Sequence, residues 1–298
     1  MSRPLVSVIM PSYNTPKDIL IEAINSIFSQ TYNNLELVIV DDGSIESVEK
    51  ILCENHINLS LIKILRNDDN AGIVYSLNRA LEESSGEFIA RMDSDDIAEI
   101  HRIEKQVDFM MKNPDISIIS TYARTFGEYE GIYKSPIEDQ DIKALMLWKN
   151  PIIHPTVMIR TNVLRDNEVI YSSRYASEDY DMWARMAFEK GLKFHVLPEV
   201  LLNYRIHKNQ VTATKNDKLK NDEIKIIFNI FKVLGIVLTK KEIELYNKAR
   251  NNEEISIREK KQLFFLLKKI QGYNLTGISK KYLSKLYIYQ MIKIIVKC

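Results

Sequence analysis

The sequence predicts an α/β fold with a mostly parallel central sheet flanked by helices, followed by a helical C-terminal region. Short apolar runs alternate with amphipathic helical patterns over residues 5–96, and such alternation is typical of right-handed βαβ units. Polar or acidic residues follow several of these runs, as they do where parallel strands end at a ligand site. From residue 210 onward, lysines alternate with Ile, Leu and Phe in helical patterns.

The expected elements have clear start and stop signals. Leu5–Met10 is a buried-strand run that ends at the turn Pro11–Asn14, and Pro16 opens a helical pattern. Residues 124–150 give no clear pattern. The other expected strands cover 35–40, 61–65, 86–92, 116–120, 153–160 and 200–207, and the other helical patterns 74–81, 103–110 and 182–187.

The composition is that of a globular protein with one large domain, or a domain and an appendage. The 298 residues are 45% hydrophobic and 27% charged, so a sizeable core can be buried. The two cysteines, Cys53 and Cys298, argue against disulfides or a cysteine metal site and suit a reducing cytosol. Met1–Pro4 lead straight into a strand-like run, so no signal peptide is expected, and no run reaches the roughly 18 apolar residues of a membrane span.

The near-neutral total charge hides an asymmetry. Residues 208–298 contain 20 Lys and Arg against 8 Asp and Glu, a net charge of +12. The rest of the chain has the remaining 21 basic and 32 acidic residues, a net charge of −11. We therefore expect an acidic body and a basic tail.

The fourth expected strand ends in Asp93-Ser94-Asp95-Asp96, which places three carboxylates within four residues. Carboxylates so crowded repel one another unless a cation or water lies among them. The motif predicts a Mg²⁺ or Mn²⁺ site, and the alternative is a solvated loop whose acids cap the next helix. Neither Gly-x-Gly-x-x-Gly nor a Walker A motif occurs, so the metal would have to neutralise the diphosphate of a bound nucleotide.

Two further strand ends carry polar motifs, Pro11-Ser12-Tyr13-Asn14 and Asp41-Asp42-Gly43-Ser44. The carboxyl ends of parallel strands meet at one rim of a sheet, so we expect these motifs to converge with the acidic one. Asp42 is assigned to capping the helix after Gly43. Tyr13 follows the first strand, and the alternative to a functional role for it is packing in the core.

These motifs together resemble the family 2 glycosyltransferases of GT-A fold. The resemblance is carried by Val8–Asn14, Val40–Ser44, Asn70–Gly72 and Asp93–Asp96, in the same order and spacing over roughly the first two-thirds of the chain. It implies an inverting transferase that uses a nucleotide-diphosphate sugar, usually with uridine as the base. It implies that Pro11, Tyr13 and Asp41 bind the nucleotide base, with Asp41 accepting a hydrogen bond from a ring N–H. It implies further nucleotide contacts from Arg66 and Ser94. It places Asp93 at the ribose and the metal, and makes Asp95 a direct metal ligand.

A second chemical motif is Ser177–Trp183, where Glu178 and Asp179 stand at the first turn of a helix. The helix dipole favours carboxylates there, so capping is the alternative. Direct inversion needs one general base for the acceptor hydroxyl, because a metal-held diphosphate leaves without a proton. The Glu-Asp pair resembles the family's base motif. This makes Asp179 the base and Glu178 a neighbour that binds acceptor or raises the pKa of Asp179.

Two histidines and one arginine complete the candidate site. His207, two residues after Arg205 at a strand end, matches the family's third metal contact, with a surface role as the alternative. Arg205 is expected to offset diphosphate charge or to brace its loop. His154 lies in Ile153–Arg160, which also resembles the family, and is expected to contact substrate or to be a satisfied, partly buried histidine.

We therefore predict a GT-A catalytic domain over 1–209, with a nucleotide-sugar half of about 1–120 and an acceptor half of about 121–209, and a basic helical region over 210–298. The predicted reaction moves a hexose (Glc, Gal or an N-acetyl form) from a UDP-sugar to a hydroxyl of a lipid-linked saccharide, with Mn²⁺ or Mg²⁺ and formation of a β-linkage. Assembly of bacterial capsule, O-antigen or a related surface polysaccharide is the expected setting, without a nucleic-acid partner.

Two alternatives remain open, one another kind of enzyme and one a binding protein. A sugar nucleotidyltransferase would need a Lys/Arg-rich Gly loop after the first strand, and none is visible. An inactive nucleotide-binding scaffold would have no need of Asp179.

The basic helical pattern of the C-terminal region also allows two interpretations. The basic helix Tyr282–Val296 predicts attachment to the inner face of the plasma membrane. The alternative is that it packs on the catalytic domain or on a partner chain.

Overall fold

The computed structural model describes residues 3–207 and 216–296, which form two compact units. Within these residues, the first unit takes 3–135, 152–174 and 192–207, and the second takes 136–151, 175–191 and 216–296. The boundary predicted at residues 209 and 210 and the C-terminal Cys298 lie outside the described residues. Cys53 is a free, exposed thiol.

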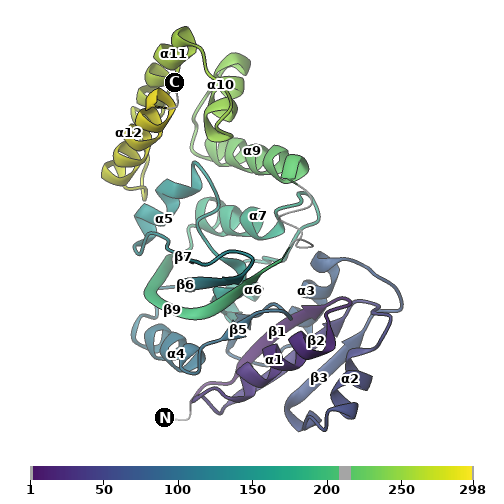
Figure 1. Cartoon of the computed structure of the whole chain (residues 1–298). Helices are drawn as coiled ribbons and strands as arrows, with labels where there is room; N and C mark the ends of the chain where they lie inside the picture. The colour runs from purple at the N-terminus through teal and green to yellow at the C-terminus, as the bar shows by residue number, and fades with distance from the viewer. Residues whose placement is uncertain (1–2, 208–215, 297–298) are drawn as a thin grey trace. The chain divides into compact units, whose positions relative to one another are not determined.

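The first unit is built on a nine-stranded sheet (Figure 1). Its order is β3-β2-β1-β4-β8-β6-β9-β5, and β7 pairs with β6. This arrangement, with helices on its faces, confirms the predicted α/β class. The strands are β1 (Val6–Ser12), β2 (Leu35–Asp41), β3 (Ile62–Arg66), β4 (Phe88–Arg91), β5 (Ile97–Ala98), β6 (Ile118–Gly127), β7 (Gly131–Tyr133), β8 (Met158–Arg160) and β9 (Phe194–Ile206).

Strands β1 to β4 are parallel to one another, as the alternation of strands and helices predicts. Beyond β4 the sheet is mixed, because β8 runs antiparallel to both β4 and β6 while β9 runs parallel to β6. The strand expected over 153–160 begins only at Met158, since His154–Thr156 forms a 3₁₀ turn around Pro155. Proline cannot donate to a strand ladder, which accounts for the late start.

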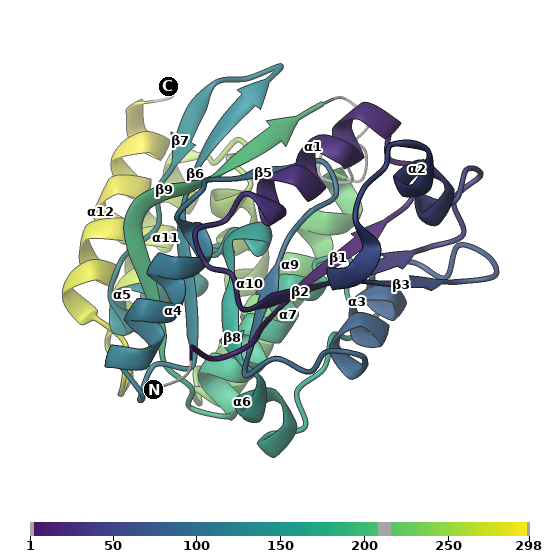
Figure 2. The same cartoon turned by 90° about the horizontal axis from the view of Figure 1, so that it is seen from below.

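Helices α1 (Lys17–Phe28) and α2 (Val48–Glu54) cover one face of β1–β3, and α3 (Ile73–Glu82) covers the other (Figure 2). The apolar runs of β1 and β2 are buried on both faces, and alternate residues join the same hydrophobic cluster as α1, α2 and α4 (Arg102–Lys112). Burial of each such Val, Leu or Ile contributes about 1.5–3 kcal/mol. A short helix, α6 (Thr161–Asp166), follows β8.

The second unit is helical. Residues 124–150, whose sequence gave no clear pattern, include α5 (Asp139–Met146) of this unit. The last residue of α5 and the two residues after it accept hydrogen bonds from other helices of the unit. The carbonyl of Met146 accepts from the Tyr180 hydroxyl and that of Leu147 from the Tyr246 hydroxyl, while Trp148 O accepts from Arg250 Nε at 2.7 Å. The remaining elements are α7 (Glu178–Ala184), a π-helical turn (Arg185–Glu189), α9 (Asn216–Val233), α10 (Lys240–Arg250), α11 (Ile257–Gln271) and α12 (Lys280–Val296).

Among the described helices, none combines the length and the apolar character needed to cross a bilayer.

Candidate active site

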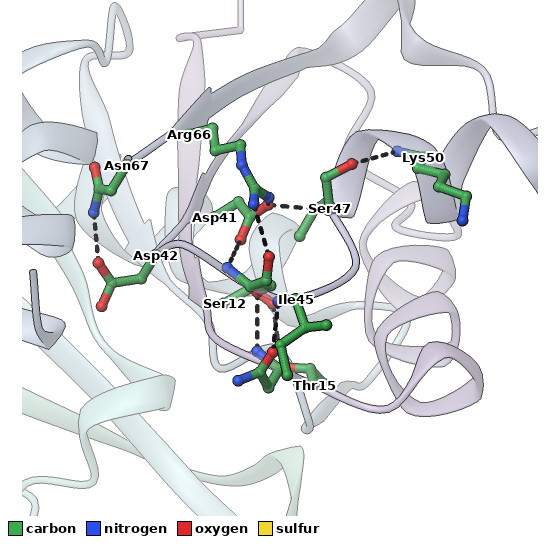
Figure 3. A network of polar contacts seen from close by, with 12 residues as sticks. Ser12, Thr15, Asp41, Asp42, Ile45, Ser47, Lys50, Arg66 and Asn67 are labelled. Atoms are coloured by element: carbon green, nitrogen blue, oxygen red, sulfur yellow. Dashed lines mark hydrogen bonds and ion pairs between the residues drawn. The ribbon is translucent and has the colours of Figure 1, made fainter. Parts of the chain in front are cut away.

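The carboxyl ends of β1, β2 and β3 meet at Asp41. The strand register sets this residue between Ser12 of β1 and Arg66 of β3. Asp41 is only 1% exposed; its Oδ1 accepts from Ser44 N at 2.9 Å, and its Oδ2 accepts from Val48 N at 3.1 Å and pairs with Arg66 (Figure 3). A carboxylate offers about four acceptor directions, and these donors take three of them. The structure thus brings together Asp41 and Arg66, two of the predicted nucleotide contacts.

The capping role predicted for Asp42 is wrong. Its oxygens accept from Asn67 Nδ2 at 2.6 Å and from the backbone N–H groups of Ala71 and Gly72, both at 2.9 Å. Asp42 therefore holds the turn before α3 and does not cap the helix after Gly43. That helix begins at Val48 and is capped by Ser47 and by Asp41. The reason is the alternation of side chains along a strand end, which turns neighbouring residues to opposite sides.

Gly43 allows this turn to form. Its φ of +74° lies in the left-handed region, and a Cβ there would come within 2.6 Å of the Asp69 carbonyl carbon. Only glycine fits such a close approach at that φ.

The end of β4 lies beside the end of β1. Met92 N donates to Ile9 O at 3.0 Å, and a chain of hydroxyls joins Ser12, Thr15 and Ser94 through contacts of 3.1 and 2.7 Å. Pro11 is half-buried in β1. Tyr13 is 52% exposed, so it is not a core residue and its ring is accessible at this rim.

The acidic motif after β4 forms a compact cluster. One ligand atom from each of Asp93, Asp95 and Asp96 can be chosen so that all lie within 4.8 Å of one another. Burial and then the charge of Asp93 raise the pKa of Asp95, and the same two causes raise that of Asp96. Asp96 is fully buried, and its Oδ2 has no hydrogen-bond partner among the described residues. Repelling carboxylates with an unpaired oxygen form a donor set that fits a hard divalent cation.

His207 follows directly after β9, and its Nε2 lies 3.1 Å from Asp95 Oδ2. The structure therefore brings the predicted histidine to the predicted carboxylate. Arg205 braces this loop: its backbone N–H donates to Asp96 Oδ1 and its Nε to Asp95 O, both at 2.8 Å. Its guanidinium carbon lies 4.5 Å from the centre of the Phe126 ring. Bracing is one of the two roles expected for Arg205.

Two buried arginines next to this cluster were not predicted. Arg91 pairs with Asp93, whose charge raises the arginine pKa against the opposing effect of burial. Arg102 donates to Arg91 O at 2.7 Å, and burial lowers its pKa to about 9. A signal for Arg91 was present, because a charge inside the apolar run of β4 must find a partner when buried.

The second motif belongs to the second unit. Glu178 and Asp179 occupy the first turn of α7, as predicted. Asp179 Oδ1 accepts from Tyr180 N and Oδ2 from Asn150 Nδ2, both at 2.7 Å. Asp222 of α9 holds the preceding loop by accepting from Ala176 N at 2.9 Å.

His154 fits the second of its two expected roles. It is buried, its Nε2 lies 2.7 Å from the Tyr171 hydroxyl, and burial holds its pKa well below the ordinary value. It is a satisfied, buried histidine of the first unit.

Comparison with known proteins identifies the relatives of this chain. Residues 7–172 match the family model described as glycosyl transferase family 2. The chain is 32% identical to an uncharacterized glycosyltransferase of Haemophilus influenzae, over 99% of this chain and 96% of that protein. It is 30% identical to WfgD of Escherichia coli, a UDP-Glc:alpha-D-GlcNAc-diphosphoundecaprenol beta-1,3-glucosyltransferase, over 72% and 83% of the two chains.

Solved structures share the fold. Residues 1–349 of TarS from S. aureus, determined with UDP-GlcNAc, align with a TM-score of 0.64 at 18% identity, over 97% of this chain and 88% of that one. The mannosyltransferase PcManGT of Pyrobaculum calidifontis, determined with GDP-Man and Mn²⁺, aligns with a TM-score of 0.60 at 17% identity, over 99% and 88%. These likenesses confirm the predicted GT-A fold.

Proposed function

The chain belongs to glycosyl transferase family 2, and we propose that it transfers a hexose from a UDP-sugar to an acceptor hydroxyl with inversion, in a metal-dependent reaction that leaves a β-linkage. The observation that carries this proposal is the rim at which Asp41, Arg66 and Ser12 of three strand ends adjoin the carboxylates after β4. In this proposal, residues of about 1–120 hold the donor, residues of about 121–209 hold the acceptor, and the basic C-terminal region over 210–298 follows, helical within its described residues 216–296.

The roles follow from the chemistry of each group. Asp93, Asp95 and His207 would hold Mg²⁺ or Mn²⁺, which supplies charge neutralisation for the diphosphate. Pro11, Tyr13, Asp41, Arg66 and Ser94 bind the nucleotide. Asp179 takes the proton of the acceptor hydroxyl while that oxygen bonds to the anomeric carbon from the face opposite the diphosphate. The bond from carbon to diphosphate oxygen breaks, its electron pair leaves with UDP, and the configuration inverts.

The acceptor is proposed to be a lipid-linked saccharide in surface polysaccharide assembly. The support comes from relatives: WfgD is named for a GlcNAc-diphosphoundecaprenol acceptor, and WbnJ of Escherichia coli, 32% identical over 68% of this chain, is named for O-antigen biosynthesis.

A panel of sugar nucleotides tests the reaction. UDP-Glc, UDP-Gal, UDP-GlcNAc, UDP-GalNAc and GDP-Man are incubated with the protein and Mn²⁺, and nucleotide release is measured with and without EDTA. We expect release from a UDP-sugar that falls at least about 100-fold in EDTA, because the acidic cluster needs its cation. Turnover of GDP-Man alone, or turnover unchanged by EDTA, would contradict the proposal. Metal-dependent UDP binding without any turnover would indicate a transferase that needs its acceptor, whereas the absence of both turnover and binding would contradict the proposal.

We further propose that α12 docks on an anionic bilayer at the inner face of the plasma membrane. The 17-residue helix has four lysines and no carboxylate. Leu283, Tyr287 and Ile294 are buried, while the opposite face presents apolar side chains to solvent. That face consists of Lys281, Lys285, Ile288, Ile292 and Ile295, spaced by four and three residues, with Tyr289 and Val296 beside it. Cationic and apolar groups on one helix face match anionic headgroups above acyl chains.

Vesicle co-sedimentation tests this attachment. The variant Ile288→Asp/Ile292→Asp is expected to lower partition onto phosphatidylglycerol-containing vesicles at least about tenfold, because it places charge on the exposed apolar surface that would enter the bilayer. Val237→Asp, at an exposed loop position of the same unit, is the matched control and should bind as the wild type does. Equal binding of wild type and double variant, or no preference over neutral vesicles, would exclude this surface.

A further inference from the structure

Asn150 and Asp179 are 29 residues apart in the sequence and are joined by a hydrogen bond of 2.7 Å from Asn150 Nδ2 to Asp179 Oδ2. Both lie in the second unit, Asn150 in the segment after α5 and Asp179 in the first turn of α7. We propose that Asn150 is a positioning residue, which fixes the carboxylate of Asp179 in the orientation needed to take the acceptor proton. This inference rests on the proposed role of Asp179 as the base.

Each oxygen of this carboxylate accepts a hydrogen bond. Tyr180 N donates to Oδ1 and Asn150 Nδ2 to Oδ2, each at 2.7 Å. The side-chain torsion that turns an aspartate carboxylate is broad when nothing holds it. Each carboxylate oxygen therefore has a donor, one within the helix and one from a distant segment. The contact from Asn150 can be removed by substitution of a side chain, whereas the contact from Tyr180 belongs to the backbone.

The donor is itself held in place. Met146, Leu147 and Trp148 use three successive backbone carbonyls to accept hydrogen bonds from Tyr180, Tyr246 and Arg250. The Trp148 side chain is buried, with its ring centre 5.0 Å from that of Tyr246. The backbone two to four residues before Asn150 is therefore anchored to α7 and α10, which is the kind of support that keeps a catalytic carboxylate in one geometry.

The amide also suits the chemistry of a base. An Asn side chain donates without carrying charge or a titratable proton, and a hydrogen bond donated to a carboxylate favours its ionised form. Glu178, Tyr180 and Asp181 are the titratable residues nearest to Asp179 along α7, and burial raises the pKa of Tyr180, so this phenol stays protonated. Asn150 therefore favours an Asp179 that is ionised and oriented before acceptor binds.

Steady-state kinetics of Asn150→Ala test this role. We expect kcat to fall about 10–100-fold, as misorientation of a reacting group does, while KM for the UDP-sugar stays within about twofold of the wild-type value. Asn251→Ala is the matched control, because it removes an amide that bonds Asn247 and Glu253 in the same unit. Its kcat should match that of the wild type. In the double variant Asn150→Ala/Asp179→Asn, the rate should equal that of Asp179→Asn alone, because the amide acts only through the base.

Several outcomes would overturn the inference. These are a kcat of Asn150→Ala within twofold of wild type, a loss that appears in KM alone, or losses that add fully in the double variant. Should circular dichroism show Asn150→Ala to be unfolded, the isosteric Asn150→Asp replaces the donor by an acceptor and must lose at least as much kcat. A fully active Asp179→Asn would instead refute the proposed base, whatever Asn150 does.

Discussion

Asp179→Asn is expected to lower the rate of sugar transfer by about 10²–10⁴-fold, the usual contribution of a general base. The amide has the same shape but cannot take a proton from the acceptor hydroxyl. Its carbonyl oxygen can still accept from Asn150, and the contact that is lost is that from Tyr180 N, so the local fold and UDP binding should persist. Initial rates of UDP release in the presence of acceptor measure the effect, and calorimetric titration with UDP and Mn²⁺ shows that the donor site is intact.

Glu178→Gln provides the matched control, since it makes the same chemical change at the neighbouring carboxylate. We expect this variant to keep more activity than Asp179→Asn, because Glu178 is assigned to the acceptor or to the electrostatics of the base. A larger loss in Glu178→Gln would transfer the role of base to Glu178. Normal transfer by Asp179→Asn would remove the base assignment altogether.

Asp95→Asn is expected to weaken Mn²⁺-dependent UDP binding at least about 100-fold while leaving the apoprotein as stable as the wild type or more so. Burial and the charge of Asp93 raise the pKa of Asp95 above its unfolded value, so its ionised form is unfavourable in the fold without a cation. The amide removes that charge and with it a metal ligand. Thermal unfolding without metal measures the first effect. The surface variant Asp115→Asn, which loses a pair with Lys193, is the control for a lost carboxylate.

The half of the fold that is proposed to bind nucleotide could be predicted because each of its parts has a local signal. The apolar runs of β1, β2 and β4 are separated by helical patterns, and parallel pairing follows from that order. The convergence of the polar motifs at one rim of the sheet could be predicted too, since Asp41, Asp93 and Asp95 stand where parallel strands end. Asp42 was misassigned because the sequence does not show to which side of a strand end a side chain turns.

The remaining strands of the first unit, and the segments that make up the second unit, could not be predicted from the sequence. Strands β5 and β7 have two and three residues, too few for a periodic pattern. The contacts of Met146, Leu147 and Trp148 use backbone carbonyls, which any residue type supplies, so residues 124–150 gave no signal of their partners. Asn150 was missed for a related reason: its partner is 29 residues away, and only the folded chain brings the amide to Asp179.

In the proposed mechanism, the carboxylates after β4 hold a cation and a UDP-sugar together. Calorimetric titration of the wild-type protein with UDP, first in Mn²⁺ and then in EDTA, tests it most directly. We predict binding in Mn²⁺ that is lost in EDTA and equally lost in Asp95→Asn. UDP affinity that is the same in Mn²⁺, in EDTA and in Asp95→Asn would contradict the claim and return the acidic cluster to a structural role.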